Sequence, residues 1–181
     1  MISSEHALVI IDMQEGLFRG PASPHSADAV LTNILLLIAK ARQSQVPIFF
    51  IRHVGPDGSP FSASSPLTRL IAELDVDVER DIVLTKTYPS CFRDTELQRQ
   101  LTQRGVKQLV IAGMKTEFCV DTTCRAAPEL GLRTVLISDA HTTMDNDCLS
   151  ASDIIAHHNN TLAGPFVTLS TARDWLFSTV N

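Results

Sequence analysis

The sequence predicts an α/β fold, a three-layer αβα domain built around a doubly wound, six-stranded parallel sheet with strand order 3-2-1-4-5-6. Short apolar runs alternate along the chain with longer segments whose apolar residues recur at the helical period. The runs are apolar throughout, which indicates strands that are buried on both faces of a parallel sheet. Because no repeat or linker-like stretch divides residues 1–181, we expect a single domain.

The six expected strands are short and rich in β-branched and aromatic residues. The first reads ALVII, the second PIFFI and the fourth QLVIA. In chain order, the expected strands span 7–11, 47–51, 81–85, 108–112, 133–138 and 166–169.

The segments between the strands are expected to be helical, apart from a Gly-, Pro- and Ser-rich loop at 53–65. Val30, Ile34 and Ile38 show the helical spacing in the first of them. Glycines directly follow three of the segments, as is typical after a helix C-terminus. The expected helices span 28–45, 67–74, 94–104, 117–130, 147–163 and 170–177.

The composition excludes several classes of function. With 15 basic and 20 acidic residues, the formal charge is −5, which argues against non-specific binding to nucleic acid or to anionic membranes. Aromatic residues make up 6%, too few for a stacking platform for single strands. We expect a cytoplasmic protein, because the first residues carry no basic leader and the apolar runs are too short to span a bilayer.

The four cysteines are Cys91, Cys119, Cys124 and Cys148. No two have CxxC spacing, which argues against a structural zinc site or a redox pair. Phosphate-binding and dinucleotide-binding glycine motifs are absent, as is the HExxH zinc motif. We therefore expect neither a cofactor nor a metal, and chemistry at one or two of the thiols at most.

Candidate catalytic residues follow the strands. In the predicted strand order, ligands bind beyond the carboxyl ends of strands one and four. Asp12 follows strand one, Lys86 follows strand three, and Cys119 lies in the first turn of the helix after strand four. A helix N-terminus is expected to lower the pKa of that thiol. Singly, each residue is more commonly a capping aspartate, a solvated lysine or a packed thiol, but their convergence favours catalysis.

Three blocks resemble the isochorismatase-like cysteine hydrolases: LVIIDMQEGLF, TKTYPSCFRDTEL and LVIAGMKTEFCVDTTCRAAPELGLRTVLISDA. The resemblance implies a catalytic triad of Asp12, Lys86 and Cys119. It also implies a cis peptide bond at Met114–Lys115 and an oxyanion hole formed by the backbone N–H groups of Lys115 and Cys119.

The resemblance implies hydrolysis of a C–N bond in a small amide, ureido or imide compound through a thioester on Cys119. Isochorismatases proper cleave a vinyl ether and lack this cysteine, so vinyl-ether hydrolysis stays an alternative. A second alternative is a catalytically idle member of the fold that binds a small molecule or a protein.

Substrate-binding residues are expected from loop positions: Phe18, His53, Tyr88 and Glu117. Nicotinamidases of the family carry an Asp-Trp-His motif that binds a metal, whereas this chain reads IRHVGPDGSPF around His53. That departure argues against a metal and against nicotinamidase activity. The resemblance also implies a homo-oligomer, with apolar stretches around Phe61 and Pro128 as candidate interface segments.

Overall fold

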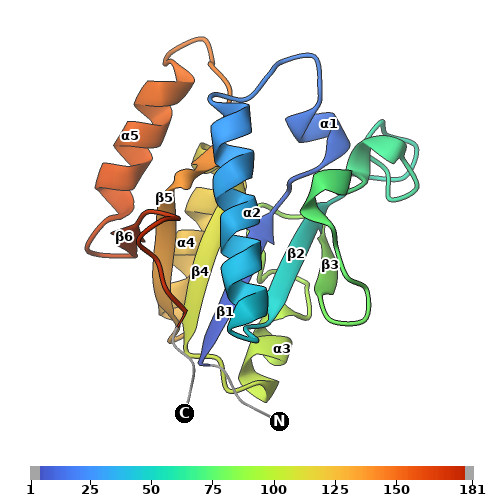
Figure 1. The fold of residues 1–181 in the computed structure, drawn as a ribbon. Coiled ribbons are helices and arrows are strands. Elements are labelled where there is room, and N and C mark those ends of the chain that lie inside the picture. The colour runs from blue at the N-terminus through green and yellow to red at the C-terminus, as the bar shows by residue number, and fades with distance from the viewer. Residues whose placement is uncertain (1–4, 178–181) are drawn as a thin grey trace.

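One six-stranded parallel sheet organises residues 5–177, the part of the chain that the computed structural model describes (Figure 1). Its strand order, β3-β2-β1-β4-β5-β6, confirms the predicted doubly wound topology. The strands are β1 (His6–Ile11), β2 (Ile48–His53), β3 (Ile82–Lys86), β4 (Gln108–Met114), β5 (Arg133–Thr142) and β6 (Thr168–Ser170).

Helices cover both faces of the sheet. One face packs against α2 (Ala27–Gln43), and the other packs against α3 (Leu97–Gln103), α4 (Asp121–Glu129) and α5 (Ala151–Leu162). Figure 1 shows α2 standing in front of the sheet with α4 behind it. Adjacent residues of β2 divide between the two cores, since Phe50 packs on the α2 side and Phe49 on the other. This double burial explains the uninterrupted apolar runs.

The carboxyl ends of β1 and β4 lie side by side in the centre of the sheet. Their register pairs Ile10 with Ala112 and Ile11 with Gly113. The reversal of strand order therefore occurs where the sequence predicted it, and the residues that follow these strands share one edge of the sheet.

The prediction of a final helix at 170–177 is wrong. The segment forms a turn, because Lys40 Nζ donates hydrogen bonds to the carbonyls of Ala172, Arg173 and Trp175 at 2.7–2.8 Å. The Asp139 carboxylate also accepts a hydrogen bond from Ala172 N. These tertiary contacts hold the segment as a single turn, in which Trp175 N donates to Thr171 O at 3.0 Å.

The predicted helix at 67–74 is instead two 3₁₀ turns, Pro66–Thr68 and Ala72–Leu74. The residues between them pair with the chain after β1: Arg69 O accepts from Glu15 N at 2.9 Å, and Ile71 N donates to Met13 O at 3.0 Å. This segment thereby lies against α1 (Glu15–Phe18), a short helix that the sequence did not reveal.

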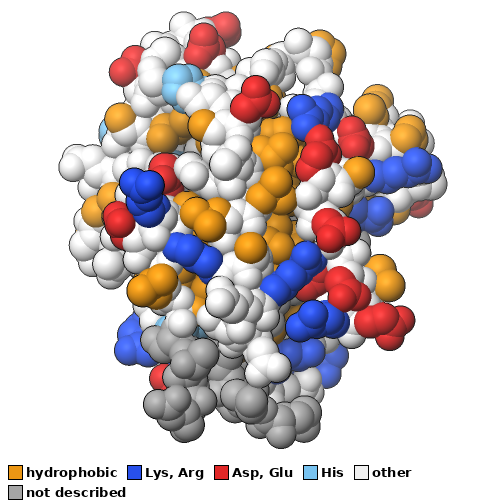
Figure 2. Space-filling model, in the orientation of Figure 1, with side chains coloured by type: hydrophobic (Ala, Val, Ile, Leu, Met, Phe, Trp, Pro, Cys, Tyr) orange, Lys and Arg blue, Asp and Glu red, His pale blue; other side chains and the backbone are white. Residues whose placement is uncertain are grey.

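Within residues 5–177, no helix is long and apolar enough to cross a lipid bilayer. Figure 2 shows a band of apolar side chains beside α2 on the face it presents. Leu35 and Leu36 of α2 are 36% and 39% exposed.

Candidate active site

Three side chains from separate parts of the sequence meet at the carboxyl edge of the sheet. Lys86 Nζ donates a hydrogen bond to Asp12 Oδ2 at 2.8 Å and another to Cys119 Sγ at 3.1 Å. The Lys86 side chain is fully buried and that of Asp12 is 1% exposed, whereas Cys119 is partly exposed. The structure therefore brings together the three residues that the sequence singled out.

Asp12 leaves β1 in an unusual backbone conformation. Its φ of 52° lies in the left-handed region, which aspartate tolerates better than most residues, and its N–H donates to Ile51 O at 3.0 Å. Such strain is found at functional sites, where the surrounding fold holds it. The left-handed conformation of Asp12 turns its carboxylate toward the ends of the neighbouring strands.

Gly113 lets the chain after β4 approach β1 closely. A Cβ atom there would lie 2.1 Å from Ile11 O, and the residue has a φ of 121°. Only glycine fits both the space and the dihedral angle. The close approach brings the turn that carries Cys119 toward Asp12.

Cys119 lies in a π-helix, Thr116–Val120, which continues directly into α4. The thiol therefore occupies the first turn, as predicted, although that turn is wider than an α-helical one. The peptide bond joining Met114 and Lys115 is cis, as the resemblance implied.

Burial and the attraction between the two charges shift the pKa values of both Asp12 and Lys86. Burial raises the pKa of Asp12, and the nearby Lys86 charge opposes that rise without cancelling it. Burial is the largest single influence on the pKa of Lys86 and lowers it, but Asp12 together with the nearby Cys91 and Cys119 outweighs burial, so the lysine pKa is raised. Lys86 therefore stays protonated, and Asp12 is a stronger base than an exposed aspartate.

The pKa of the Cys119 thiol is raised to about 12, chiefly by burial and then by the negative charge of Asp12. The predicted lowering of this pKa by the helix N-terminus is wrong for the resting site, where the neutral thiol predominates. Burial raises the pKa of Cys91 to about 12 as well, and that of Cys124 further still. Cys148 lies in an exposed loop before α5.

Two of the four residues predicted to bind substrate lie beside this site. His53 Nδ1 is 3.4 Å from Lys86 Nζ. Glu117 lies two residues before Cys119 in the π-helix; its Oε1 accepts a hydrogen bond from Thr143 Oγ1 at 2.9 Å, and its buried Oε2 has no partner.

The other two predicted substrate-binding residues contact different groups. Phe18 of α1 is buried in the core on the α2 side, with 3% exposure. Tyr88 lies two residues beyond Lys86 and is 36% exposed, with the Arg93 guanidinium 3.8 Å from its ring centroid.

Sequence reasoning missed Gln14. Its Nε2 donates to the carbonyls of His53 and Thr68, each at 2.9 Å, and its Oε1 accepts from His53 N at 2.8 Å. This side chain ties the end of β2 to the first 3₁₀ turn. Its place two residues after Asp12 was the available signal.

A second missed group is the buried imidazole of His141 in β5. Its Nδ1 lies 2.9 Å from Thr116 Oγ1, at the start of the π-helix, and its Nε2 lies 2.9 Å from Asn159 Oδ1 in α5. Burial lowers the pKa of His141 to about 4, so the ring is neutral at physiological pH. A neutral ring that bonds an amide oxygen carries its proton on Nε2, which leaves Nδ1 to accept from Thr116.

Among the described residues, no three or more His, Cys, Asp or Glu side chains are grouped so that they could hold a metal ion. His53 contacts Lys86 rather than other potential ligands. The donor set around the buried pair suits proton transfer and thiol chemistry.

Comparison with known proteins agrees with the fold. A family model described as an isochorismatase domain matches residues 6–163. This chain belongs to the isochorismatase family. A crystal structure of an isochorismatase family protein superimposes with a TM-score of 0.86 at 35% identity, covering 93% of this chain and 99% of that one.

The chain is similar to proteins that carry several different names. A secreted isochorismatase effector of Verticillium dahliae is 31% identical over 95% of this chain and 90% of its own length. A streptothricin hydrolase of Streptomyces noursei is 37% identical over 77% of this chain and 50% of its own length. Nicotinamidase 3 of Arabidopsis thaliana is 31% identical over 81% of this chain and 77% of its own length.

Proposed function

We propose that this isochorismatase-family chain is a cysteine hydrolase that cleaves a C–N bond of a small amide, ureido or imide compound. One observation carries the proposal: Lys86 Nζ lies within hydrogen-bond distance of both Asp12 Oδ2 and Cys119 Sγ. A nucleophile, a carboxylate base and a cation thus share one buried site. Relatives named nicotinamidase and streptothricin hydrolase add support for hydrolysis of this kind.

Asp12 is the proton acceptor in the proposed first step. Lys86 donates a hydrogen bond to Asp12 Oδ2. Asp12 Oδ1 is buried without a hydrogen-bond partner and is free to take the thiol proton. The resulting thiolate attacks the substrate carbonyl carbon, while the Lys86 ammonium balances its charge. Because the resting thiol pKa is high, this proton transfer accompanies substrate binding rather than preceding it.

Backbone N–H groups of Lys115 and Cys119 are proposed to stabilise the oxyanion that forms. The carbonyl of Lys115 accepts hydrogen bonds from Phe118 N and Val120 N, the amides on either side of Cys119 N. This pattern supports a Cys119 amide directed to a ligand rather than to the preceding turn. A well-placed donor of this kind contributes about 3–4 kcal/mol to transition-state stabilisation.

The proposed intermediate collapses with transfer of the Asp12 proton to the leaving nitrogen. Ammonia or an amine departs, and the acyl group stays on Cys119 as a thioester. Water then gives a proton to Asp12 and attacks the thioester carbonyl. Loss of the sulfur, reprotonated from Asp12, releases the acid product and restores the site.

Glu117 is proposed to accept an N–H from the substrate. Its unpartnered buried Oε2 lacks a donor that a substrate amide or ureido group can supply. Thr143 fixes the other oxygen, so the carboxylate is already oriented. His53 is proposed to line the same pocket from the β2 side, and Phe18 and Tyr88 remain predicted contacts.

The test is ammonia release from a panel of small amides, ureido compounds and imides, with Cys119→Ala as the control. We expect turnover of one substrate class and its loss in the variant by about 10³-fold or more. Full activity of Cys119→Ala on a true substrate would favour vinyl-ether hydrolysis. No turnover of any panel compound by the unmodified chain would favour an idle binding protein.

Self-association and a cytoplasmic location remain predictions. Of the two segments suggested for an interface, Phe61 lies over Gly16 of α1, and Pro128 lies inside α4. Light scattering on the purified chain measures the oligomeric state.

A further inference from the structure

A cavity on the α2 side of the sheet has two arginines in its wall. Its volume is about 290 Å³, and it lies between strands β2 and β3 and the segment that contains the two 3₁₀ turns. Its lining residues are Arg52, Arg69, Leu70, Ile71, Ala72, Val76 and Val83. The size is near the lower end of small-molecule sites, which span about 300–1,000 Å³.

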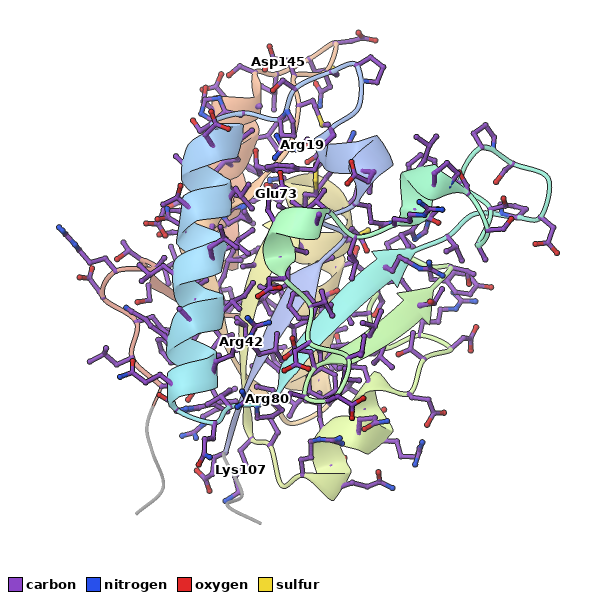
Figure 3. The ribbon with its side chains drawn as sticks, turned by 45° about the vertical axis from the view of Figure 1, so that its right-hand side comes forward. Arg19, Arg42, Glu73, Arg80, Lys107 and Asp145 are labelled. Carbon is purple, nitrogen blue, oxygen red and sulfur yellow. The ribbon has the colours of Figure 1, made fainter. Side chains whose placement is uncertain are left out.

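Both arginines lack a carboxylate partner within residues 5–177. Arg52 is partly buried, and its Nε is buried with no hydrogen-bond partner. Three carboxylates of the neighbouring segment are paired with other arginines: Glu73 with Arg19, and Asp75 and Asp81 with Arg42. Figure 3 shows Arg19 beside Glu73, and Arg42 lower down beside α2. Among the described residues, neither arginine of the cavity wall is engaged in an ion pair of its own, and the buried Arg52 Nε has no acceptor.

A buried guanidinium N–H without an acceptor costs free energy that a bound anion would recover. Five of the seven lining residues are apolar, which lowers the local polarity and strengthens such a contact. Arginine also matches the planar geometry of a carboxylate. From this combination we propose that the cavity is a binding site for a small organic carboxylate with a short apolar tail.

The cavity is separate from the candidate active site. Arg52 and His53 are consecutive residues of β2 and therefore project to opposite faces of the sheet. His53 contacts Lys86 of the candidate site, whereas Arg52 lines the cavity. Binding there is independent of the reaction proposed above.

The test uses hexanoate as the probe in isothermal titration calorimetry on the full chain, with hexanol and inorganic phosphate as matched probes. We expect saturable binding of hexanoate, and weaker binding of the uncharged alcohol and of the tail-less anion. Arg52→Met and Arg69→Met should each weaken hexanoate binding about tenfold or more. Arg80→Met is the control, because Arg80 is exposed and lies outside the lining.

Arg69 is exposed, so Arg69→Met keeps the test decisive even if Arg52→Met does not fold. Hexanoate affinity unchanged in Arg69→Met, or lost equally in Arg80→Met, would overturn the proposal. Phosphate binding as tight as hexanoate would show that the apolar wall contributes nothing and that the assigned ligand class is wrong.

Discussion

The Lys86 ammonium lies 3.1 Å from the Cys119 sulfur, although the two residues are 33 positions apart in sequence. Its second hydrogen bond holds Asp12, so one buried cation contacts both the proposed base and the proposed nucleophile. Burial raises the pKa of this thiol most, the Asp12 carboxylate raises it further, and Lys86 only partly opposes them, so the resting thiol stays protonated.

Replacing Lys86 by methionine should destabilise the fold by about 3–5 kcal/mol, because it leaves the buried Asp12 charge without a partner. Denaturant unfolding measures the change in free energy. The matched control is Lys107→Met, which removes an exposed, solvent-screened ion pair with Glu5 and should change the free energy of unfolding far less. Equal effects of the two substitutions would contradict a buried, partner-dependent Asp12.

Asp12→Asn separates thiol acidity from proton transfer. Burial raises the pKa of Cys119 most and the Asp12 charge raises it further, so removing that charge lowers this pKa, and alkylation by iodoacetamide at pH 7.5 should become faster. Turnover should nevertheless fall by about 10²-fold or more, because the variant lacks the base. Mass spectrometry measures alkylation of Cys119 against the exposed Cys148 as an internal reference. Slower alkylation of Cys119 would show that Asp12 promotes the thiolate in the resting site.

His141 should make the folded state sensitive to acid. Its pKa is about 4 in the fold and near 6.5 when unfolded, so the unfolded state binds the extra proton first as pH falls. The stabilisation is fully present above pH 6.5 and is lost progressively between pH 6.5 and 4, by about 3 kcal/mol in total.

Unfolding free energies of the unmodified chain and of His141→Gln, measured across this pH range, isolate that contribution. The substituted chain should lack this part of the pH dependence. His157→Gln, at an exposed position, should retain it. Identical pH profiles for all three proteins would rule out the buried neutral imidazole.

Gly113→Ala should cost more than about 4 kcal/mol or prevent folding, because the added Cβ would meet Ile11 O at 2.1 Å. Gly131→Ala is the control, since Gly131 also has a positive φ, of 79°, but has no atom near the added Cβ. Strain alone should cost about 1–2 kcal/mol there. Thermal unfolding of both variants measures the difference, and similar losses would argue against the close approach of β1 and β4.

Apolar periodicity was sufficient to predict the sheet. Strands buried on both faces read as uninterrupted apolar runs, so β1, β2 and β4 could be predicted directly, and the strand order is the common one for doubly wound folds. Asp12, Lys86 and Cys119 could be placed together because parallel strands end at a common edge.

Features fixed by distant contacts could not be read locally. The segment at 170–177 has helix-compatible residues. Its carbonyl groups, however, accept hydrogen bonds from Lys40, which is far away in the sequence. The acidity of Cys119 depends on burial and on Asp12, neither of which is visible from its place at a helix start. Gln14 and His141 act through hydrogen bonds to residues far away in the chain, so their types alone carried little signal.

Lys86 stands at the end of β3, the outermost strand, whereas Asp12 follows β1 in the middle, with β2 between them. Neither local collapse nor the central strands alone can join the two side chains. During refolding, catalytic competence must therefore wait for the last strand on that side to dock, a non-local and slow event. The rate at which enzymatic turnover returns during refolding would thus report the rate at which β3 docks on β2.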